Sequence, residues 1–248
     1  MAVISVANAK GGSGKTTAAV LLATEFVQRG ARTALLDCDD LKLAAGWARS
    51  ARLGEGLTLV DTVAVSNLAG YLKALRATHQ HIVIDLSGAR DALVAFAVGL
   101  SDLVLVPVQG CAMDSRGAAH VLELIDLVGA NSHRTINRAV VLSRVNPLVT
   151  TRALRSVKAL LDGAKIPVID TPVIERAAFR DMFETGGTLY SIAAGRTSNL
   201  DKAILNMQAF ADAVLRFAVG NDGRKPLARA QAGAVAGATQ PAMAFPAP

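Results

Sequence analysis

A glycine-rich loop near the amino terminus carries the strongest chemical signal in this sequence. Residues 10–17 read Lys-Gly-Gly-Ser-Gly-Lys-Thr-Thr, between an apolar run and a helix-like stretch. Glycines let a backbone approach phosphate closely, and N–H groups at a helix N-terminus point toward an anion. In such loops the lysine before the threonines reaches the β- and γ-phosphates, and the first threonine hydroxyl binds Mg²⁺. The predicted nucleotide-binding residues are Gly11, Gly12, Ser13, Gly14, Lys15, Thr16 and Thr17.

Two later apolar runs end in aspartates, at Asp37-Cys38-Asp39 and at Asp85. The carboxyl ends of parallel strands meet at one edge of a sheet, where ligands bind. One carboxylate of the first pair can position or deprotonate an attacking water, and the other can organise the waters around Mg²⁺. Asp85 fits the Walker B pattern, which holds Mg²⁺ through its water shell. Three residues further on, Gly88 completes an Asp-x-x-Gly pattern whose glycine N–H can sense the γ-phosphate.

The spacing of the apolar runs predicts the elements that position these residues. Most runs are continuous rather than alternating, as expected for strands buried on both faces. Strands alternating with helices predict an α/β fold, a doubly wound and mainly parallel sheet flanked by helices. We expect strands at 2–7, 33–36, 81–86, 103–108, 139–143 and 166–169. We expect helices at 15–29, 67–78, 90–99, 115–128, 151–161 and 199–218.

Composition and charge narrow the class further. The 248 residues suit one nucleotide-binding domain at 1–219, and the Ala-, Gly- and Pro-rich stretch 220–248 predicts a disordered tail. The two cysteines fit no metal or redox spacing, and the sequence shows neither a signal peptide nor a membrane-spanning run, so we expect a cytoplasmic protein. The segment from Ser132 to Lys165 contains seven basic residues and one acidic residue. This segment predicts either a polyanion-binding surface or a solvated helix face.

The loop resembles the deviant Walker A motif of the ParA/MinD family of ATPases, because Lys10 precedes the usual glycines. The resemblance spans roughly residues 1–218 and is nearest to the short plasmid-partition ParA proteins that lack an N-terminal DNA-binding domain. It implies that Lys10 reaches the partner's nucleotide in a dimer and that Asp39 is the catalytic carboxylate. The remaining carboxylate of the pair, Asp37, is then expected to organise the water molecules around Mg²⁺. Trp47 matches a family tryptophan, whereas Asp40 and Leu41 replace the family's Pro-Gln.

The resemblance also implies which loops surround the adenine and which partners the protein binds. The loop carrying Asn146 matches a family loop that surrounds adenine, and residues 171–180 resemble the second such loop with its following helix. The family implies an ATPase that is slow without its partner, needs ATP and Mg²⁺, and forms an ATP-sandwich homodimer. It also implies nonspecific DNA binding, association with the nucleoid, and release by a ParB-like or cargo adaptor protein. The candidate DNA-binding residues, chosen by position and charge, are Arg152, Arg155, Lys158, Arg176 and Arg180.

Other functions stay open beside a DNA partition or positioning ATPase. A MinD-like membrane- or protein-directed spatial regulator is the main alternative, although the tail offers no basic amphipathic helix for a membrane. An iron–sulfur reductase needs two cysteines after the Walker B strand, where only Cys111 occurs. A pseudo-ATPase is disfavoured because Lys15, Thr16, Asp39 and Asp85 are all present. For a partition or positioning ATPase, the resemblance implies a cargo that is a plasmid, a transfer complex or a protein assembly.

Overall fold

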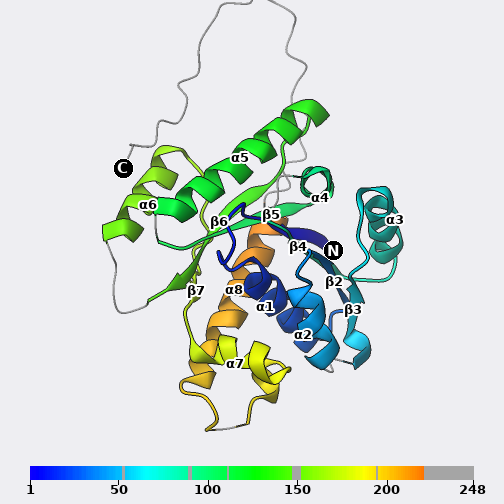
Figure 1. Ribbon diagram of the computed structural model, residues 1–248, viewed down its shortest axis with the longest axis vertical. Helices are drawn as coiled ribbons and strands as arrows, with labels where there is room; N and C mark the ends of the chain where they lie inside the picture. Colours follow the sequence, from blue (N-terminus) through cyan, green and yellow to red (C-terminus); the bar gives the residue numbers. More distant parts are fainter. Residues whose placement is uncertain (52–53, 89–90, 111, 147–151, 194, 221–248) are drawn as a thin grey trace, which may run out of the picture.

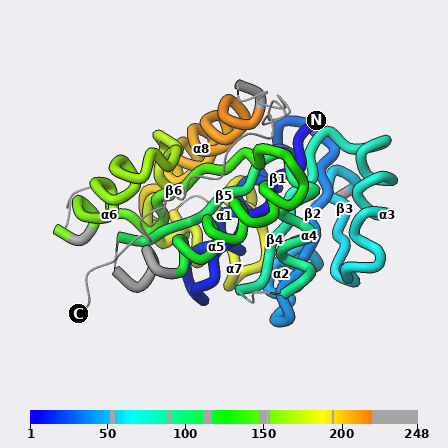
Figure 2. Tube along the Cα trace, turned by 90° about the horizontal axis from the view of Figure 1, so that it is seen from above, coloured from blue at the N-terminus to red at the C-terminus, as the bar shows by residue number. Residues whose placement is uncertain are grey.

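A seven-stranded parallel sheet organises the chain (Figure 1). The computed structural model describes residues 1–51, 54–88, 91–110, 112–146, 152–193 and 195–220. The strand order is β3-β2-β4-β1-β5-β6-β7, and every pairing is parallel. Seen from above, α3 lies beside one end of the strand series and α6 beside the other (Figure 2). The strands are β1 (Ala2–Val6), β2 (Thr33–Cys38), β3 (Leu57–Val60), β4 (His81–Leu86), β5 (Leu103–Val108), β6 (Arg138–Val145) and β7 (Val173–Ile174).

Helices cover both faces of the sheet and create two apolar cores. Side chains alternate along each strand, so that in β1 Ile4 packs into one core and Val3 into the other. The first core lies under α1 (Lys15–Gln28), α2 (Leu43–Ala51), α7 (Ala177–Thr185) and α8 (Leu200–Gly220). The second lies under α3 (Val65–Arg76), α4 (Ala92–Leu100), α5 (Ala112–Ser132) and α6 (Arg152–Gly163). Two short 3₁₀ helices, η1 (Gly54–Gly56) and η2 (Leu189–Ser191), join these elements.

The predicted fold class is confirmed, and several elements differ from the prediction. The strand expected at 166–169 is wrong: this segment contributes one isolated bridge, between Val168 and Val140. Pro167 has no N–H to donate, and the last strand is β7. The sequence prediction also missed β3, which is a short half-buried edge strand, and α2.

Several expectations fall on residues outside the described ranges. These are Cys111, the helix starts expected at Arg90 and Thr151, and residues 221–248 of the expected tail. The helix expected from Arg90 begins at Ala92, with the Asp91 side chain accepting a hydrogen bond from the Val94 N–H at 2.8 Å. Within the described part of the chain, no helix is long and apolar enough to cross a membrane.

The register between the strands determines where along the sheet the functional residues lie. Asp85 in β4 is paired with Val6 in β1 on one side and with Asp37 in β2 on the other. The glycine-rich loop follows β1 directly, and Asp39 follows β2. The loop and the aspartates therefore share the carboxyl edge of the sheet, which is the edge where ligands bind in this architecture.

His81, at the start of β4, makes stability depend on pH. Its ring stacks on Phe26 with centroids 4.3 Å apart. Burial, followed by the amino-terminal ammonium and Arg29, lowers the pKa of His81 to about 4 from 6.5. Below pH 6.5 the unfolded chain binds a proton that the folded chain does not bind. The free energy of unfolding therefore falls as the pH drops toward 4.

We expect His81→Phe to weaken this pH dependence, because phenylalanine keeps the aromatic packing and cannot be protonated. Urea unfolding of wild type and variant at pH 7 and pH 5 measures the effect. The wild type should lose more unfolding free energy than the variant over this interval, since all other titrating groups are common to both. Equal losses in the two proteins would show that His81 does not titrate differently on folding.

Candidate nucleotide-binding site

The loop between β1 and α1 has the backbone form of a phosphate cradle. Gly12 and Gly14 have φ angles of 74° and 99°, which are left-handed values that favour glycine. A Cβ atom at Gly11 or Gly12 would meet nothing within 4 Å, so open space lies over this part of the loop. Gly14 caps α1, whose first residue is Lys15. The loop thus presents bare backbone and a helix N-terminus to an anion.

Two buried polar side chains that the sequence prediction missed brace this loop. Asn8 donates from Nδ2 to the Pro107 carbonyl at 2.7 Å and accepts the Lys10 N–H at Oδ1 over 2.8 Å. Ser143, near the end of β6, donates from Oγ to the Ser13 carbonyl at 2.7 Å. Both signals are present in the sequence, because each residue lies at or beyond the carboxyl end of an apolar run. The loop is therefore held by β5 and β6 as well as by its own strand and helix.

Lys15 and Asp85 form the buried charged centre of the site. The Lys15 ammonium donates to the Lys10 carbonyl at 3.3 Å. Burial lowers the pKa of Lys15, and nearby Asp85 and Asp39 oppose this shift. Burial also raises the pKa of Asp85 to about 7, although the Thr16 hydroxyl acts to lower it. Both Asp85 carboxylate oxygens are buried without a hydrogen bond of good geometry from the described protein residues.

Asp37 organises the segment that carries Asp39. Its Oδ1 accepts the Asp39 N–H at 3.0 Å, and its Oδ2 accepts the Ala45 N–H at 2.8 Å in the first turn of α2. Asp39 in turn accepts the Leu41 N–H at Oδ1 over 3.0 Å. Asp37 is fully buried, whereas Asp39 is half-buried and lines the cavity described below. Asp37 thus anchors the turn, and Asp39 is presented to the cavity.

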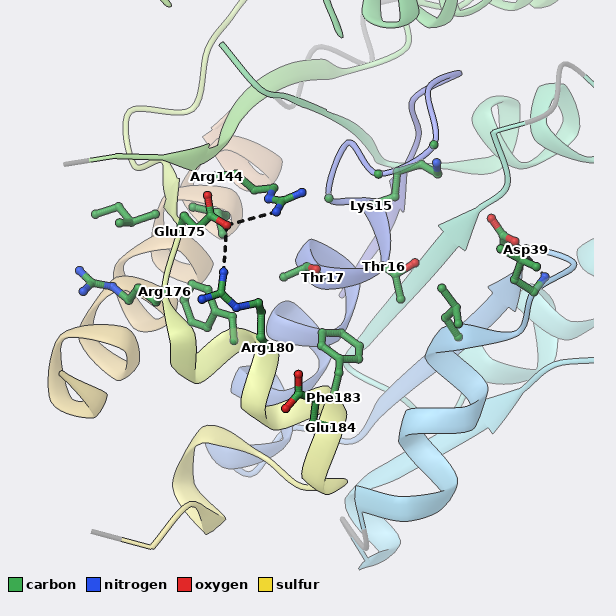
Figure 3. A pocket seen from close by; sticks show the side chains of 18 residues that line it. Lys15, Thr16, Thr17, Asp39, Arg144, Glu175, Arg176, Arg180, Phe183 and Glu184 are labelled. Atoms are coloured by element: carbon green, nitrogen blue, oxygen red, sulfur yellow. Dashed lines mark hydrogen bonds and ion pairs between the residues drawn. The ribbon is translucent and has the colours of Figure 1, made fainter. Parts of the chain in front are cut away.

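A cavity of about 490 Å³ extends from the loop toward α7. This volume falls in the range of small-molecule sites, roughly 300–1,000 Å³. Figure 3 shows Lys15, Thr16 and Thr17 between Asp39 on one side and a group from β6 and α7 on the other. In that group Glu175 binds Arg144 at 3.1 Å and Arg180 at 3.2 Å. The sequence prediction placed Arg144 and Glu175 in the two loops expected around the adenine but gave neither residue a role of its own.

The remaining predicted residues divide between the loop and more distant surfaces. Lys10 is half-buried, and its Cβ lies 3.1 Å from the position of a Cβ built on Gly117 in α5. A Cβ at Gly88 would lie 3.2 Å from the Ala9 carbonyl oxygen and 3.7 Å from Lys15 Nζ, so Gly88 adjoins the loop. Asn146 is exposed and is not among the described residues that line the cavity, so its adenine contact stays a prediction.

The candidate DNA-binding residues lie in two places. Arg176 and Arg180 line the cavity, and Arg176 is half-buried. Arg152, Arg155 and Lys158 are exposed on α6 at intervals of three residues, whereas Leu154, Val157 and Leu161 of the same helix are buried. The structure therefore brings two of the five candidates to the cavity and leaves three together on an outer helix.

Trp47 links α2 to the segment that follows α7. It is buried, and its indole N–H donates to the Gly187 carbonyl at 2.7 Å. Its ring lies 6.5 Å from that of Phe183 in α7. Trp47 and Phe183 line a second cavity that also reaches Thr16 and Thr17. Helix α2 and the region of α7 are thus in contact through one tryptophan.

These features fit a nucleotide with Mg²⁺. The glycine cradle and Lys15 suit the phosphates, and the Ser13 hydroxyl is buried without a hydrogen-bond partner among the described residues. The unpartnered carboxylate oxygens of Asp85, beside the Thr16 hydroxyl, suit the water shell of a hard cation. A buried carboxylate without a partner is costly in an apo protein, so the site is built to receive a positive or hydrogen-bonding group.

The parallel sheet, the loop with two lysines and the aspartates at its edge define a phosphate-loop protein of the ParA/MinD class. The chain belongs to the VirC1 protein family, whose sequence profile matches residues 1–217. It is 33% identical over 216 residues to Protein ParA of Rhizobium radiobacter, covering 87% of this chain and 97% of that protein. The resemblance noted in the sequence is therefore confirmed, and the chain is a member of a family of partition and positioning ATPases.

Solved structures with lower identity share the fold. MinD of Aquifex aeolicus superposes with a TM-score of 0.69 at 19% identity, covering 87% of this chain and 97% of that one. An aspartate-to-alanine variant of McdA from Cyanothece, in complex with ATP, superposes with a TM-score of 0.68 at 16% identity, covering 92% and 99%. At these identities the likeness shows the α/β architecture alone.

Removing the buried charge of Asp85 tests its assignment. We expect Asp85→Asn to raise the free energy of unfolding of the ligand-free protein by on the order of 1 kcal/mol, because a buried carboxylate whose oxygens accept no hydrogen bond from the described residues is replaced by a neutral amide. The same variant should lose the extra thermal stabilisation that Mg²⁺ adds to ATP, because the carboxylate no longer receives the hydrated cation. Thermal unfolding with ATP, with and without Mg²⁺, measures both effects. A variant that keeps the full Mg²⁺ effect would remove Asp85 from the cation site.

Proposed function

We propose that this protein is an ATP-dependent DNA partition or positioning ATPase. In this proposal ATP binding produces a sandwich homodimer, the dimer binds DNA without sequence preference, and hydrolysis releases it. The observation that carries the proposal is the glycine cradle with Lys15, which lines one cavity together with Asp39 and interacts electrostatically with the buried Asp85. The ATP complex of a McdA variant and the ParA relative give further support.

The proposed chemistry assigns one role to each side chain. Lys15 and the loop N–H groups hold the β- and γ-phosphates and neutralise charge that develops as the bond between them breaks. Asp39 orients a water molecule toward the γ-phosphorus and takes its proton. Thr16, Asp85 and Asp37 would hold Mg²⁺ directly or through its water shell, and the cation would stabilise charge on the phosphate oxygens. Gly88 adjoins Lys15 and would sense the γ-phosphate.

Dimerisation and release need groups beyond one chain. Lys10 is proposed to reach the nucleotide of a second copy, so that each site is completed only when ATP joins two chains. A ParB-like or cargo adaptor protein is proposed to accelerate the slow hydrolysis. The location that follows is the cytoplasm, on the nucleoid while ATP is bound.

The proposed DNA surface is the outer face of α6. Arg152, Arg155 and Lys158 are exposed there and lie on one side of the helix. Backbone phosphates recognise such a row of cations without sequence preference. Arg176 and Arg180, also candidates by charge, line the nucleotide cavity, so α6 carries the proposal.

The deciding experiment is binding to a nonspecific DNA duplex with ATP, with ADP and without nucleotide, at two salt concentrations. Binding that requires ATP and weakens steeply with salt supports the proposal, because phosphate contacts release counterions. ATP-dependent dimerisation without DNA binding would instead favour a MinD-like regulator directed to a membrane or a protein.

Asp39→Ala should trap an ATP-bound dimer, because the water loses its proton acceptor while the phosphate cradle is unchanged. ATP turnover should fall at least a hundredfold, as is typical for the loss of a positioned general base. Phosphate release and light scattering after gel filtration measure turnover and dimerisation. Asp40→Ala is the matched control, since Asp40 is exposed and neighbours Asp39. Wild-type turnover in Asp39→Ala would move the catalytic role to another residue.

Arg152→Glu combined with Arg155→Glu should weaken DNA binding by at least tenfold at low salt and leave ATP-dependent dimerisation intact. Two phosphate contacts would become two repulsions, and the salt dependence should become shallower. The control is Lys202→Glu with Arg216→Glu, which reverses two exposed charges on α8, across the sheet from α6. Equal DNA affinity of the α6 and α8 variants would place the DNA interface elsewhere.

A further inference from the structure

Gln109, the residue directly after β5, contacts the phosphate loop with its side chain. Its amide Nε2 donates to the Gly12 carbonyl at 2.5 Å. The C=O and N–H of a trans peptide unit are coplanar and point in opposite directions. The bond from Gln109 therefore also sets the direction of the Ser13 N–H, in a loop that binds anions through its N–H groups. Gln109 thus controls the orientation of one peptide unit of the loop.

The stability of the fold does not account for this contact. The hydrogen bond is exposed to solvent, where water competes for the same donor and acceptor. Ordering the long side chain of a glutamine also costs conformational entropy. The bond therefore contributes little to folding, and its effect falls on the conformation of the loop.

Gly110, the next residue, lies against the first turn of α6. The three atoms nearest to a Cβ built on Gly110 are Cβ, Cα and Cδ1 of Leu154, at 3.1, 3.3 and 3.3 Å. The φ angle of Gly110 is not left-handed, so the close approach of the helix is what favours a glycine here. One of the three atoms belongs to the backbone of α6, so a larger residue at this position would push the helix itself.

Leu154 lies between the two arginines that begin the proposed DNA surface. Arg152 and Arg155 are exposed, whereas Leu154 is buried. Val157, about one turn further along α6, packs into the second core and holds that part of the helix to the sheet. The first turn instead packs on Gly110. A shift of Gly110 therefore moves the turn that carries both arginines.

We propose that Gln109 positions the phosphate loop and that Gln109 and Gly110, together called the β5 linker, couple this loop to the first turn of α6. This inference deepens the proposed function and rests on it, because it takes ATP and DNA as the two ligands. A phosphate that accepts the Ser13 N–H polarises the peptide unit and strengthens the hydrogen bond at its Gly12 carbonyl. Gln109 is then drawn toward the loop, Gly110 moves with it, and the first turn of α6 follows.

Coupling of this kind acts in both directions. If the ATP-bound loop favours one position of α6, DNA bound to that position must raise the affinity for ATP by the same factor. A residue that only stabilised the loop would change the affinity for ATP equally with and without DNA. The ratio of the DNA affinities with and without nucleotide therefore separates coupling from a structural role.

The experiment measures this ratio on the full chain with Mg²⁺, a non-hydrolysable ATP analogue and a fluorescently labelled nonspecific duplex. Anisotropy gives the DNA affinity with and without the analogue, and light scattering after gel filtration gives dimerisation. Gln109→Ala should lower the ratio at least about fivefold, the lower end of typical coupling factors, and change the DNA affinity without nucleotide less than about twofold. Gly110→Ala should also lower the ratio, because its methyl group displaces the turn of α6. Combining the two changes should add little, since both interrupt one connection.

Each variant has a control of the same kind away from the linker. Gln80→Ala removes a glutamine directly before β4, whose Oε1 accepts the Arg32 N–H at 2.7 Å. Gly99→Ala places a methyl group 3.3 Å from Cγ1 of Val128, between α4 and α5. Both controls should keep the wild-type ratio.

The inference is overturned if Gln109→Ala keeps the wild-type ratio. It is also overturned if Gln109→Ala abolishes dimerisation together with DNA binding, because the effect would then act on the dimer and not on α6. A wild-type protein whose DNA affinity does not depend on the analogue would overturn the proposed function itself. A large wild-type ratio that persists in both Gln109→Ala and Gly110→Ala would overturn the β5 linker alone.

Discussion

The register of three neighbouring parallel strands is the constraint on which the site depends. Val6, Asp85 and Asp37 are level across β1, β4 and β2, so the loop leaves the sheet beside two buried carboxylates. Because side chains alternate along a strand, a slip of one residue in β4 would turn Asp85 to the other face. The apolar side chains of both cores resist such a slip, since it would exchange their two environments. Packing of the cores thus sets the geometry of the charged centre.

The parts of the fold that local sequence encodes were predictable, and the parts that distant contacts create were not. Continuous apolar runs indicated β1, β2, β4, β5 and β6, and the glycine-rich loop identified itself by residue type and spacing. Helix α2 was missed because the cap of its Ala45 N–H is the Asp37 carboxylate, eight residues earlier on a strand. The strand expected at 166–169 was wrong because the prediction relied on the apolar side chains of this segment and did not consider that Pro167 has no N–H to donate to a strand ladder.

The candidate site likewise contains residues that sequence motifs identify and residues that only the folded structure brings to the site. Lys15, Thr16, Asp39 and Asp85 belong to motifs, and the structure brings them around one charged centre. The positions of Asn8 and Ser143 at or beyond the carboxyl ends of apolar runs are visible in the sequence, but the hydrogen bond that each makes across the fold is not. The ion pairs that Glu175 makes with Arg144 and Arg180 depend on a backbone irregularity at Arg144 and on the approach of β6 to the segment before α7. Positive charge in the sequence could not separate Arg176 and Arg180 at the cavity from the arginines on α6.

Trp47 gives the molecule a spectroscopic property of its own. It is the only tryptophan of the chain, it is buried, and its indole N–H is hydrogen-bonded to Gly187. The emission of an indole responds to the polarity and hydrogen bonding around it. This ring lines a cavity shared with Thr16 and Thr17, so a ligand on the loop changes the surroundings of a single fluorophore. The unlabelled protein therefore carries an internal reporter, in which both the occupancy of the loop and the contact between α2 and the segment after α7 can be followed in real time.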